Sequence, residues 1–144
     1  MVNPDETSRD YSSIFNNNAI GTGHARSMLD SDQAWSAAND AVGEWMQIDL
    51  GSIRCVNGVV TQGRNKGVYG SQRVTSYKIS YSSDGVTFTE LPEVFEGNVN
   101  NDYSNVTNSF DPVQARYVRF IVKAWEYAVS MRAAVVAGTT GILS

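Results

Sequence analysis

Residues 35–63 constrain the fold more strongly than any other stretch of the sequence. Between Glu44 and Leu50, polar side chains alternate with large apolar ones, close to the period of two that a half-buried strand requires. Gly51 ends this run, and a second apolar run covers residues 55–61. Because both runs carry large side chains, we predict two adjacent strands that form the core hairpin of an all-β domain.

The rest of the sequence shows more strand-like runs separated by turn signals. Further strands are predicted at residues 74–82, 86–91, 94–95, 105–110, 115–123 and 130–136. With the two central runs this gives about eight short strands and no convincing helix, a pattern typical of a sandwich or jelly roll. We predict a flexible N-terminal tail at residues 1–10, one domain at 11–138, and a tail or linker at 139–144.

Composition argues against several classes of protein. A chain of 144 residues, 42% hydrophobic and 18% charged, fits one compact domain. The formal net charge of −4 argues against a nucleic-acid partner, which needs a broad basic face. No apolar run approaches the roughly 20 residues of a membrane-spanning helix, so we do not expect a transmembrane protein. The first residues also lack the pattern of a signal peptide.

The reactive side chains form no pattern typical of catalysis. The single cysteine, Cys55, rules out an intrachain disulfide and lies in an apolar run, where we expect a buried thiol. His24 is the one histidine, and neither a phosphate-binding loop nor a Ser-His-Asp signature occurs. The carboxylates are scattered rather than convergent. We therefore predict no enzyme activity and no cofactor.

A structural Ca²⁺ site is a weaker hypothesis. Asp30 and Asp32, together with Asp40 and backbone carbonyls, offer the oxygen ligands that Ca²⁺ prefers. Their spacing is loose, and solvated acidic turns are the alternative interpretation.

Seven sequence motifs occur in the order of a known family. They are AWSAAND, EWMQIDLG, VNGVVTQGR, VTSYKISYSSDGVTF, FEGN, ARYVRF and AWEYAVSMR. This order resembles that of the discoidin family, also called the F5/8 type C domain, from about residue 12 to residue 138. The resemblance implies an eight-stranded antiparallel jelly-roll β-sandwich of the galactose-binding-like class, whose ligand is held by loops at one end.

By position, the resemblance places the ligand-binding loops at residues 16–24 and 64–73, with further turns at 36–40 and 125–127. It also implies an extracellular or cell-surface location. Two features depart from the family. Many extracellular members join their ends by a disulfide, for which this chain lacks the cysteines. The first loop is also short and poor in large apolar side chains, unlike that of the membrane-inserting members.

The first functional hypothesis is a non-catalytic module for cell adhesion or recognition that binds cell-surface carbohydrate. Tyrosine and arginine suit this role because each combines apolar area with a directional polar end. For each residue taken singly, an ordinary solvated loop is the alternative. The candidate ligand-binding residues are Asn17, Asn18, Ile20, Ser36, Asp40, Arg64, Lys66, Val68, Tyr69, Arg73, Trp125 and Tyr127.

The alternative hypothesis is docking to an anionic phospholipid surface, such as one containing phosphatidylserine. Val68 and Tyr69 would insert, while Arg64, Lys66 and Arg73 would meet the head groups. Partial insertion and three cations give about 5–6 kcal/mol, a dissociation constant of tens to hundreds of micromolar. Useful adhesion would then need a multidomain or oligomeric protein. A second alternative is a protein ligand, such as an extracellular-matrix or receptor partner.

Overall fold

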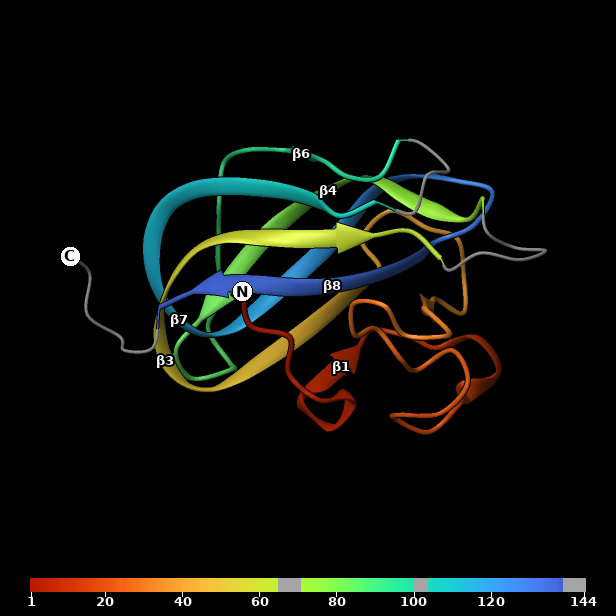
Figure 1. Ribbon diagram of the computed structural model, residues 1–144, viewed down its shortest axis with the longest axis horizontal. Coiled ribbons are helices and arrows are strands. Elements are labelled where there is room, and N and C mark those ends of the chain that lie inside the picture. The colour runs from red at the N-terminus through yellow and green to blue at the C-terminus, as the bar shows by residue number, and fades with distance from the viewer. Residues whose placement is uncertain (65–70, 100–103, 139–144) are drawn as a thin grey trace.

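The computed structural model describes residues 1–64, 71–99 and 104–138 (Figure 1). These residues form eight strands and two short 3-10 turns, which confirms the all-β prediction. The strands are β1 (Arg9–Tyr11), β2 (Trp35–Ser36), β3 (Trp45–Gln62), β4 (Arg73–Ser82), β5 (Thr89–Glu90), β6 (Phe95–Glu96), β7 (Val106–Glu126) and β8 (Ser130–Ala137). The turns are η1 (Glu6–Ser8) and η2 (Phe15–Asn17). Within the described segments, no helix has the length and apolar character needed to cross a membrane.

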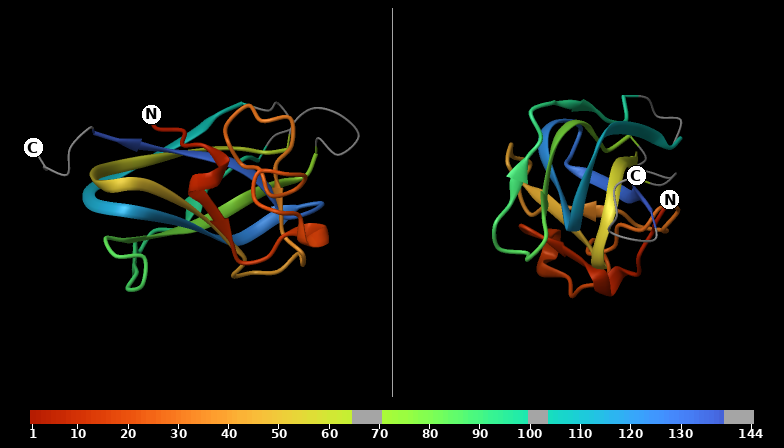
Figure 2. Two further views of the ribbon diagram at one scale, coloured as in Figure 1. Left: turned by 90° about the horizontal axis from the view of Figure 1, so that it is seen from below. Right: turned by 90° about the vertical axis from the view of Figure 1, so that its left-hand side faces the viewer.

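Two long strands fold the sheet over on itself. The strands pair antiparallel in the order β2-β8-β3-β7-β4-β5, with β1 added to β3 and β6 added to β4. The first part of β3 pairs with residues 117–121 of β7, and the second part pairs with residues 106–115. β4 pairs with residues 117–126 of β7, whereas β8 pairs with residues 56–62 of β3. The result is the predicted β-sandwich (Figure 2).

The predicted core hairpin at residues 45–61 is wrong, because both runs belong to one bent strand, β3. The register with β7 shifts between Asp49 and Arg54, where the strand passes from one layer to the other. Gly51 has a φ of +83° at this bend, and its N–H donates to Oδ1 of Asp49 over 2.8 Å. A glycine that tolerates positive φ marks a bend in a strand as readily as the end of one.

The predicted strands at residues 105–110 and 115–123 are likewise one strand, β7, which Asp111 and Pro112 do not end. Residues 110–112 stand opposite the single residue Asn57 of β3, so they form a bulge. Proline lacks the N–H that a regular strand pairing uses, and a bulge does not require it. The predicted strand at 86–91 shrinks to the two residues of β5, and the one predicted at 94–95 is β6, shifted by one residue.

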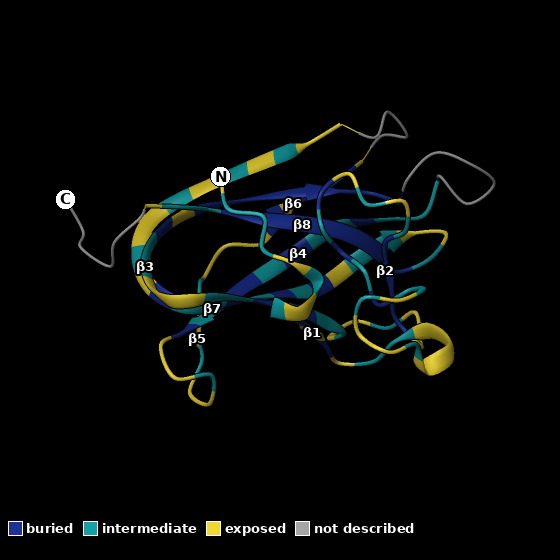
Figure 3. Cartoon of the chain, turned by 60° about the horizontal axis from the view of Figure 1, so that its bottom comes forward, coloured by how far each residue is buried: buried dark blue, intermediate teal, exposed yellow. Residues whose placement is uncertain are grey.

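The strands that face the interior of the sandwich are largely buried (Figure 3). The core between the two layers contains large apolar side chains. Met46 and Ile48, which alternate with polar neighbours in β3, are fully buried, as is Trp35 from β2. The ring of Trp35 stacks on Tyr11 of β1, with the ring centroids 5.6 Å apart. Cys55, which we expected to be buried, is only half-buried. Alternation decides which side chains fill the interior in the first part of β3, whereas the first six residues of β8 are buried in succession.

The first ten residues are packed against the sandwich and do not form the flexible tail that we predicted. The N–H of Val2 donates to the carbonyl of Val135. Arg9 is buried, and its Nη1 donates to the carbonyls of Ser27 and Ala133 over 2.7 Å each. Burial lowers the pKa of Arg9 to about 10. The polar composition of this segment did not predict its packing, because a buried arginine is stabilised by carbonyl acceptors rather than by apolar neighbours. The predicted tail at 139–144 lies outside the described residues.

Candidate ligand-binding site

Loops from distant parts of the chain gather at the end of the sandwich where β3 ends, β4 begins and β7 turns into β8 (Figure 1). They enclose a pocket of about 330 Å³. Its lining combines the rings of a phenylalanine and a histidine, several other polar side chains and a series of small apolar side chains. The lining residues are Phe15, His24, Ser36, Ala37, Ala38, Asp40, Arg64, Gln72, Ala128 and Val129.

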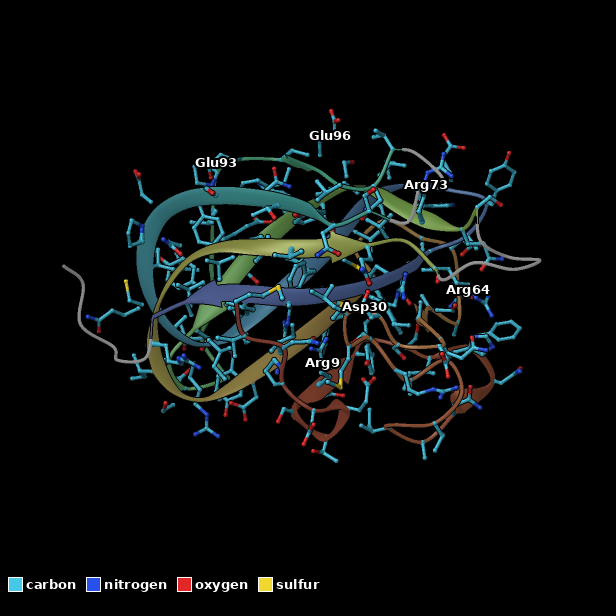
Figure 4. All side chains as sticks on the ribbon, in the orientation of Figure 1. Arg9, Asp30, Arg64, Arg73, Glu93 and Glu96 are labelled. Carbon is cyan, nitrogen blue, oxygen red and sulfur yellow. The ribbon has the colours of Figure 1, made fainter. Side chains whose placement is uncertain are left out.

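Arg64 is held in one orientation by two glutamines. Its Nη1 donates to Oε1 of Gln72 over 2.8 Å, and its Nη2 donates to Oε1 of Gln33 over 3.0 Å. Only 8% of Arg64 is exposed, and Figure 4 shows it at the loop end of the molecule. A guanidinium is a rigid fork of donors, so fixing its plane fixes the direction in which it can meet a ligand.

Asp40 connects the turn after β2 to the start of β8. Its Oδ1 accepts a hydrogen bond from the N–H of Val129 over 2.8 Å. The N–H of Ala37 donates in turn to the carbonyl of Val129 over 3.3 Å. A carboxylate has two oxygens, and within the described chain Asp40 uses only Oδ1 in a hydrogen bond to protein. The other oxygen can therefore accept a hydrogen bond from a ligand.

His24 and Phe15 form the side of the pocket contributed by the N-terminal loops. Their rings meet edge to face, with centroids 5.1 Å apart. The backbone N–H of His24 donates to Oδ1 of Asn18 over 2.9 Å. Burial, followed by the nearby charges of Arg64 and Arg26, lowers the pKa of His24. The imidazole is consequently neutral at physiological pH, and its buried Nδ1 has no hydrogen-bond partner among the described residues.

Three of the predicted ligand-binding residues line this pocket: Ser36, Asp40 and Arg64. Ser36 is buried, and its hydroxyl bonds to that of Ser130, so it belongs to the floor. Asn18 does not line the pocket but supports it through the bond to His24. The structure therefore brings Ser36, Asp40 and Arg64 together around one pocket, and their role in ligand binding stays a prediction.

Other predicted residues lie elsewhere. Asn17 is not among the lining residues, and Ile20 lines a separate groove beside β1. Arg73 donates through Nη1 to the carbonyl of Ser71 over 2.8 Å. Trp125, predicted in a loop, is part of β7 and packs against the core. Tyr127 is exposed next to the lining residues 128 and 129. The predictions for Lys66, Val68 and Tyr69 fall outside the described residues.

Sequence reasoning did not identify Phe15, His24 and Gln72 as site residues. Phe15 stands directly before the predicted loop 16–24, and it is 46% exposed. Gln72 had no distinguishing feature beyond its place in the predicted loop 64–73. The signal that could have found His24 was its position at the end of the predicted loop 16–24.

The calcium hypothesis stays a prediction. Oδ1 of Asp30 accepts a hydrogen bond from Nε2 of Gln62 over 2.9 Å, so this oxygen already has a partner within the protein. Across residues 1–64, 71–99 and 104–138, no group of three or more His, Cys, Asp or Glu side chains is placed to hold a metal ion.

An antiparallel β-sandwich with a pocket among the loops at one end has the architecture of a ligand-binding module. The sequence profile of the F5/8 type C domain matches residues 10–135. The chain therefore belongs to the F5/8 type C domain family, which confirms the resemblance drawn from the seven motifs.

Individual relatives agree with this assignment. Lactadherin from Sus scrofa is 40% identical over 108 residues, a match that covers 69% of this chain and 26% of lactadherin, so this chain corresponds to about a quarter of that protein. Wild-type discoidin II from Dictyostelium discoideum superposes with a TM-score of 0.69 at 23% identity, covering 90% of this chain and 53% of that one. The Clostridium perfringens module CpGH89CBM32-5, solved in complex with GalNAc-β-1,3-galactose, gives 0.64 at 16% identity, covering 87% and 88%. These two structural matches show the fold.

Proposed function

We propose that this domain is a non-catalytic module that binds carbohydrate on a cell surface or in the extracellular space. The observation that carries the proposal is the lining of the pocket, where the exposed ring of Phe15 occurs together with Arg64 and Asp40. A sugar ring has an apolar face of C–H groups and a rim of hydroxyls. It therefore matches an aromatic face combined with a few fixed donors and acceptors.

The polar groups of the pocket are ordered before a ligand binds. The guanidinium of Arg64 is fixed by two glutamines, and the carboxylate of Asp40 is fixed by a backbone N–H. Binding then costs little additional side-chain entropy, which favours recognition of a small polar ligand. The complex of the Clostridium perfringens module with GalNAc-β-1,3-galactose supports a sugar as ligand.

We propose further that the domain acts as one module of a larger or oligomeric protein. The match to lactadherin covers only 26% of that relative. A single pocket of about 330 Å³ contacts one small ligand, and several copies on one protein would raise the weak affinity of each through effective concentration.

The test is a glycan array with the whole chain, followed by titration calorimetry with the sugar that binds. Phe15→Ala should weaken binding about tenfold, because an aromatic contact contributes about 1–1.5 kcal/mol. Ile53→Ala is the matched control, since Ile53 is 44% exposed at the bend of β3 and lies outside the pocket lining. An array without any bound glycan, or an equal effect of both substitutions, would contradict the proposal.

Anionic phospholipid is the second candidate ligand, and exposed apolar side chains at the loop end favour it. Phe15, Val42 and Tyr127 are all large hydrophobic residues that the fold leaves exposed there. The burial of Arg64 argues against it, because a guanidinium held by two glutamines does not reach out to a head group. Vesicle sedimentation with phosphatidylserine tests it. Val42→Ser should reduce binding, whereas Val86→Ser, an exposed control in the turn before β5, should not.

A further inference from the structure

We infer that the binding site extends beyond the pocket to Tyr127, and that the ligand is a chain of at least two sugar residues. The inference rests on the proposed carbohydrate-binding function and specifies its ligand class. One sugar would occupy the pocket, and the next would stack on the ring of Tyr127 outside it.

The backbone at Tyr127 is strained. The N–H of Ala128 donates to the carbonyl of Glu126 over 2.7 Å, a bond from residue i+2 to residue i that defines a γ-turn. Tyr127 is its central residue and has a φ of +65°, which places the turn in the rare, strained class. Bulky residues seldom adopt positive φ, and glycine or asparagine would form such a turn at lower cost. The sequence nevertheless has a tyrosine there.

The residues that form the pocket also hold this turn in place. Directly after the turn, the N–H of Val129 donates to Asp40, and its carbonyl accepts from the N–H of Ala37. On the other side of the turn, Glu126 is the last residue of β7 and stands opposite Arg73 in the antiparallel pairing of β7 with β4. Strain persists only where the surroundings determine the conformation, and such positions cluster at binding sites. Ala128 and Val129, which immediately follow Tyr127, are part of the pocket lining.

Strain at Tyr127 is not offset by burial of its ring. The residue is 74% exposed, so the fold gains little apolar burial from it. Tyr11 and Tyr77, in contrast, are buried in the core. An exposed aromatic face beside a ligand pocket is a surface on which a second sugar ring can stack.

The size of the pocket limits how much of a longer glycan it can enclose. Its volume of about 330 Å³ lies at the low end of the roughly 300–1,000 Å³ found for small-molecule sites. It therefore suits one sugar ring with its substituents. A longer glycan has to continue over the rim, and the turn at Tyr127 forms the rim beside Ala128.

The experiment compares a monosaccharide with a disaccharide that contains it, using calorimetry on the full chain. N-acetylgalactosamine and GalNAc-β-1,3-galactose are the first pair, and a glycan array of single and paired sugars supplies another pair if these do not bind. The wild type should bind the disaccharide about tenfold more tightly. Tyr127→Ala should remove that advantage and leave monosaccharide affinity unchanged. Tyr127→Phe, which keeps the ring, should retain most of it.

Val86→Ala is the matched control, because Val86 is 83% exposed in the turn before β5 and should alter neither affinity. Equal binding of both sugars by the wild type would overturn the inference while leaving the proposed function intact. The same holds if Tyr127→Ala weakens both sugars equally, since the residue would then act only through the pocket. Failure of every sugar to bind would instead overturn the proposed function, and this inference with it.

Discussion

The outer face of the β3–β7 layer and the loop end of the molecule both carry aromatic and arginine side chains, but they use them differently. On the sheet face, the guanidinium of Arg119 lies between the rings of Trp45 and Phe88, at 3.9 and 4.0 Å from their centroids. Its Nη2 also donates to Oε1 of Gln47 over 2.8 Å. Each aromatic group in this cluster has a partner within the protein.

At the loop end, the aromatic groups are left with open faces. The ring of Phe15 has an edge contact with His24 and is otherwise half exposed, and Tyr127 is largely exposed. Arg64 lines the pocket at this end and donates to the side-chain amide oxygens of Gln72 and Gln33. The difference indicates that the sheet-face cluster stabilises the fold, whereas the loop end keeps its aromatic surface available for a ligand.

Removing the sheet-face arginine should produce the largest change in stability. Arg119→Ala should lower the free energy of unfolding by about 2 kcal/mol, because two cation–π contacts and a hydrogen bond are lost. Sugar affinity should not change. Urea unfolding measures the loss, with Lys123→Ala, an exposed position on the same strand, as the control. If Arg119→Ala altered binding but not stability, the division between the two regions would be wrong.

Replacing Tyr127 by glycine should have the opposite effect on stability. Tyr127→Gly should raise the free energy of unfolding by about 1 kcal/mol, since glycine adopts the φ of +65° without steric cost. Tyr127→Ala retains the strain and should gain less. Urea unfolding of the three proteins checks this order. A loss of stability on Tyr127→Gly would mean that the tyrosine side chain itself stabilises the turn.

Local sequence patterns were sufficient for the shorter strands β4 and β8. The strands predicted at residues 74–82 and 130–136 match β4 and β8 within one residue at either end. In β4 buried and half-buried residues largely alternate, whereas the first six residues of β8 are all buried, as expected for a short apolar run in the interior of a sheet. The bends in β3 and β7 could not be predicted in the same way. Gly51 and Pro112 are local signals that fit a turn and a bulge equally well, and only pairing with distant strands decides between them.

The candidate site was predictable only in part for a related reason. Asp40 and Arg64 follow from polar turns that the family resemblance places at one end of the sandwich. Phe15 and His24 join the pocket through packing of the N-terminal loop on β2, where the carbonyl of His24 accepts from the N–H of Ser36. A contact between these two segments produces no repeating pattern of apolar and polar residues in either of them, so the sequence alone did not predict it.

As the pH falls, the free energy of unfolding should first decrease through protonation of His24 at the loop end. Protonation of Asp49 on the sheet face should lower it only at a more acidic pH. The folded state lowers the pKa of His24, so it favours the neutral imidazole. The unfolded chain binds this proton near pH 6.5. The contribution of His24 to the free energy of unfolding is therefore fully present above about pH 6.5. It decreases as the pH falls below this value, by at most about 1.4 kcal/mol per pH unit. His24 is the one histidine in the sequence, so His24→Gln should abolish the change between pH 7 and pH 5. Urea unfolding at both pH values tests this, and an unchanged pH dependence in the variant would refute it.

The smallest effect is expected at the ion pair on the sheet face. Oδ1 of Asp49 accepts from Nε of Arg116 over 2.8 Å, and this hydrogen bond, assisted by one from the N–H of Gly51, lowers the pKa of Asp49. A carboxylate with a lowered pKa adds stability above its unfolded pKa of about 4, and this contribution is lost as the pH falls through the folded value. Because both side chains are partly exposed, Asp49→Asn should cost only about 0.5 kcal/mol at pH 7. The difference between wild type and variant should disappear near pH 2 in urea unfolding. A difference that persisted there would show that Asp49 acts through the bend at Gly51 rather than through its charge.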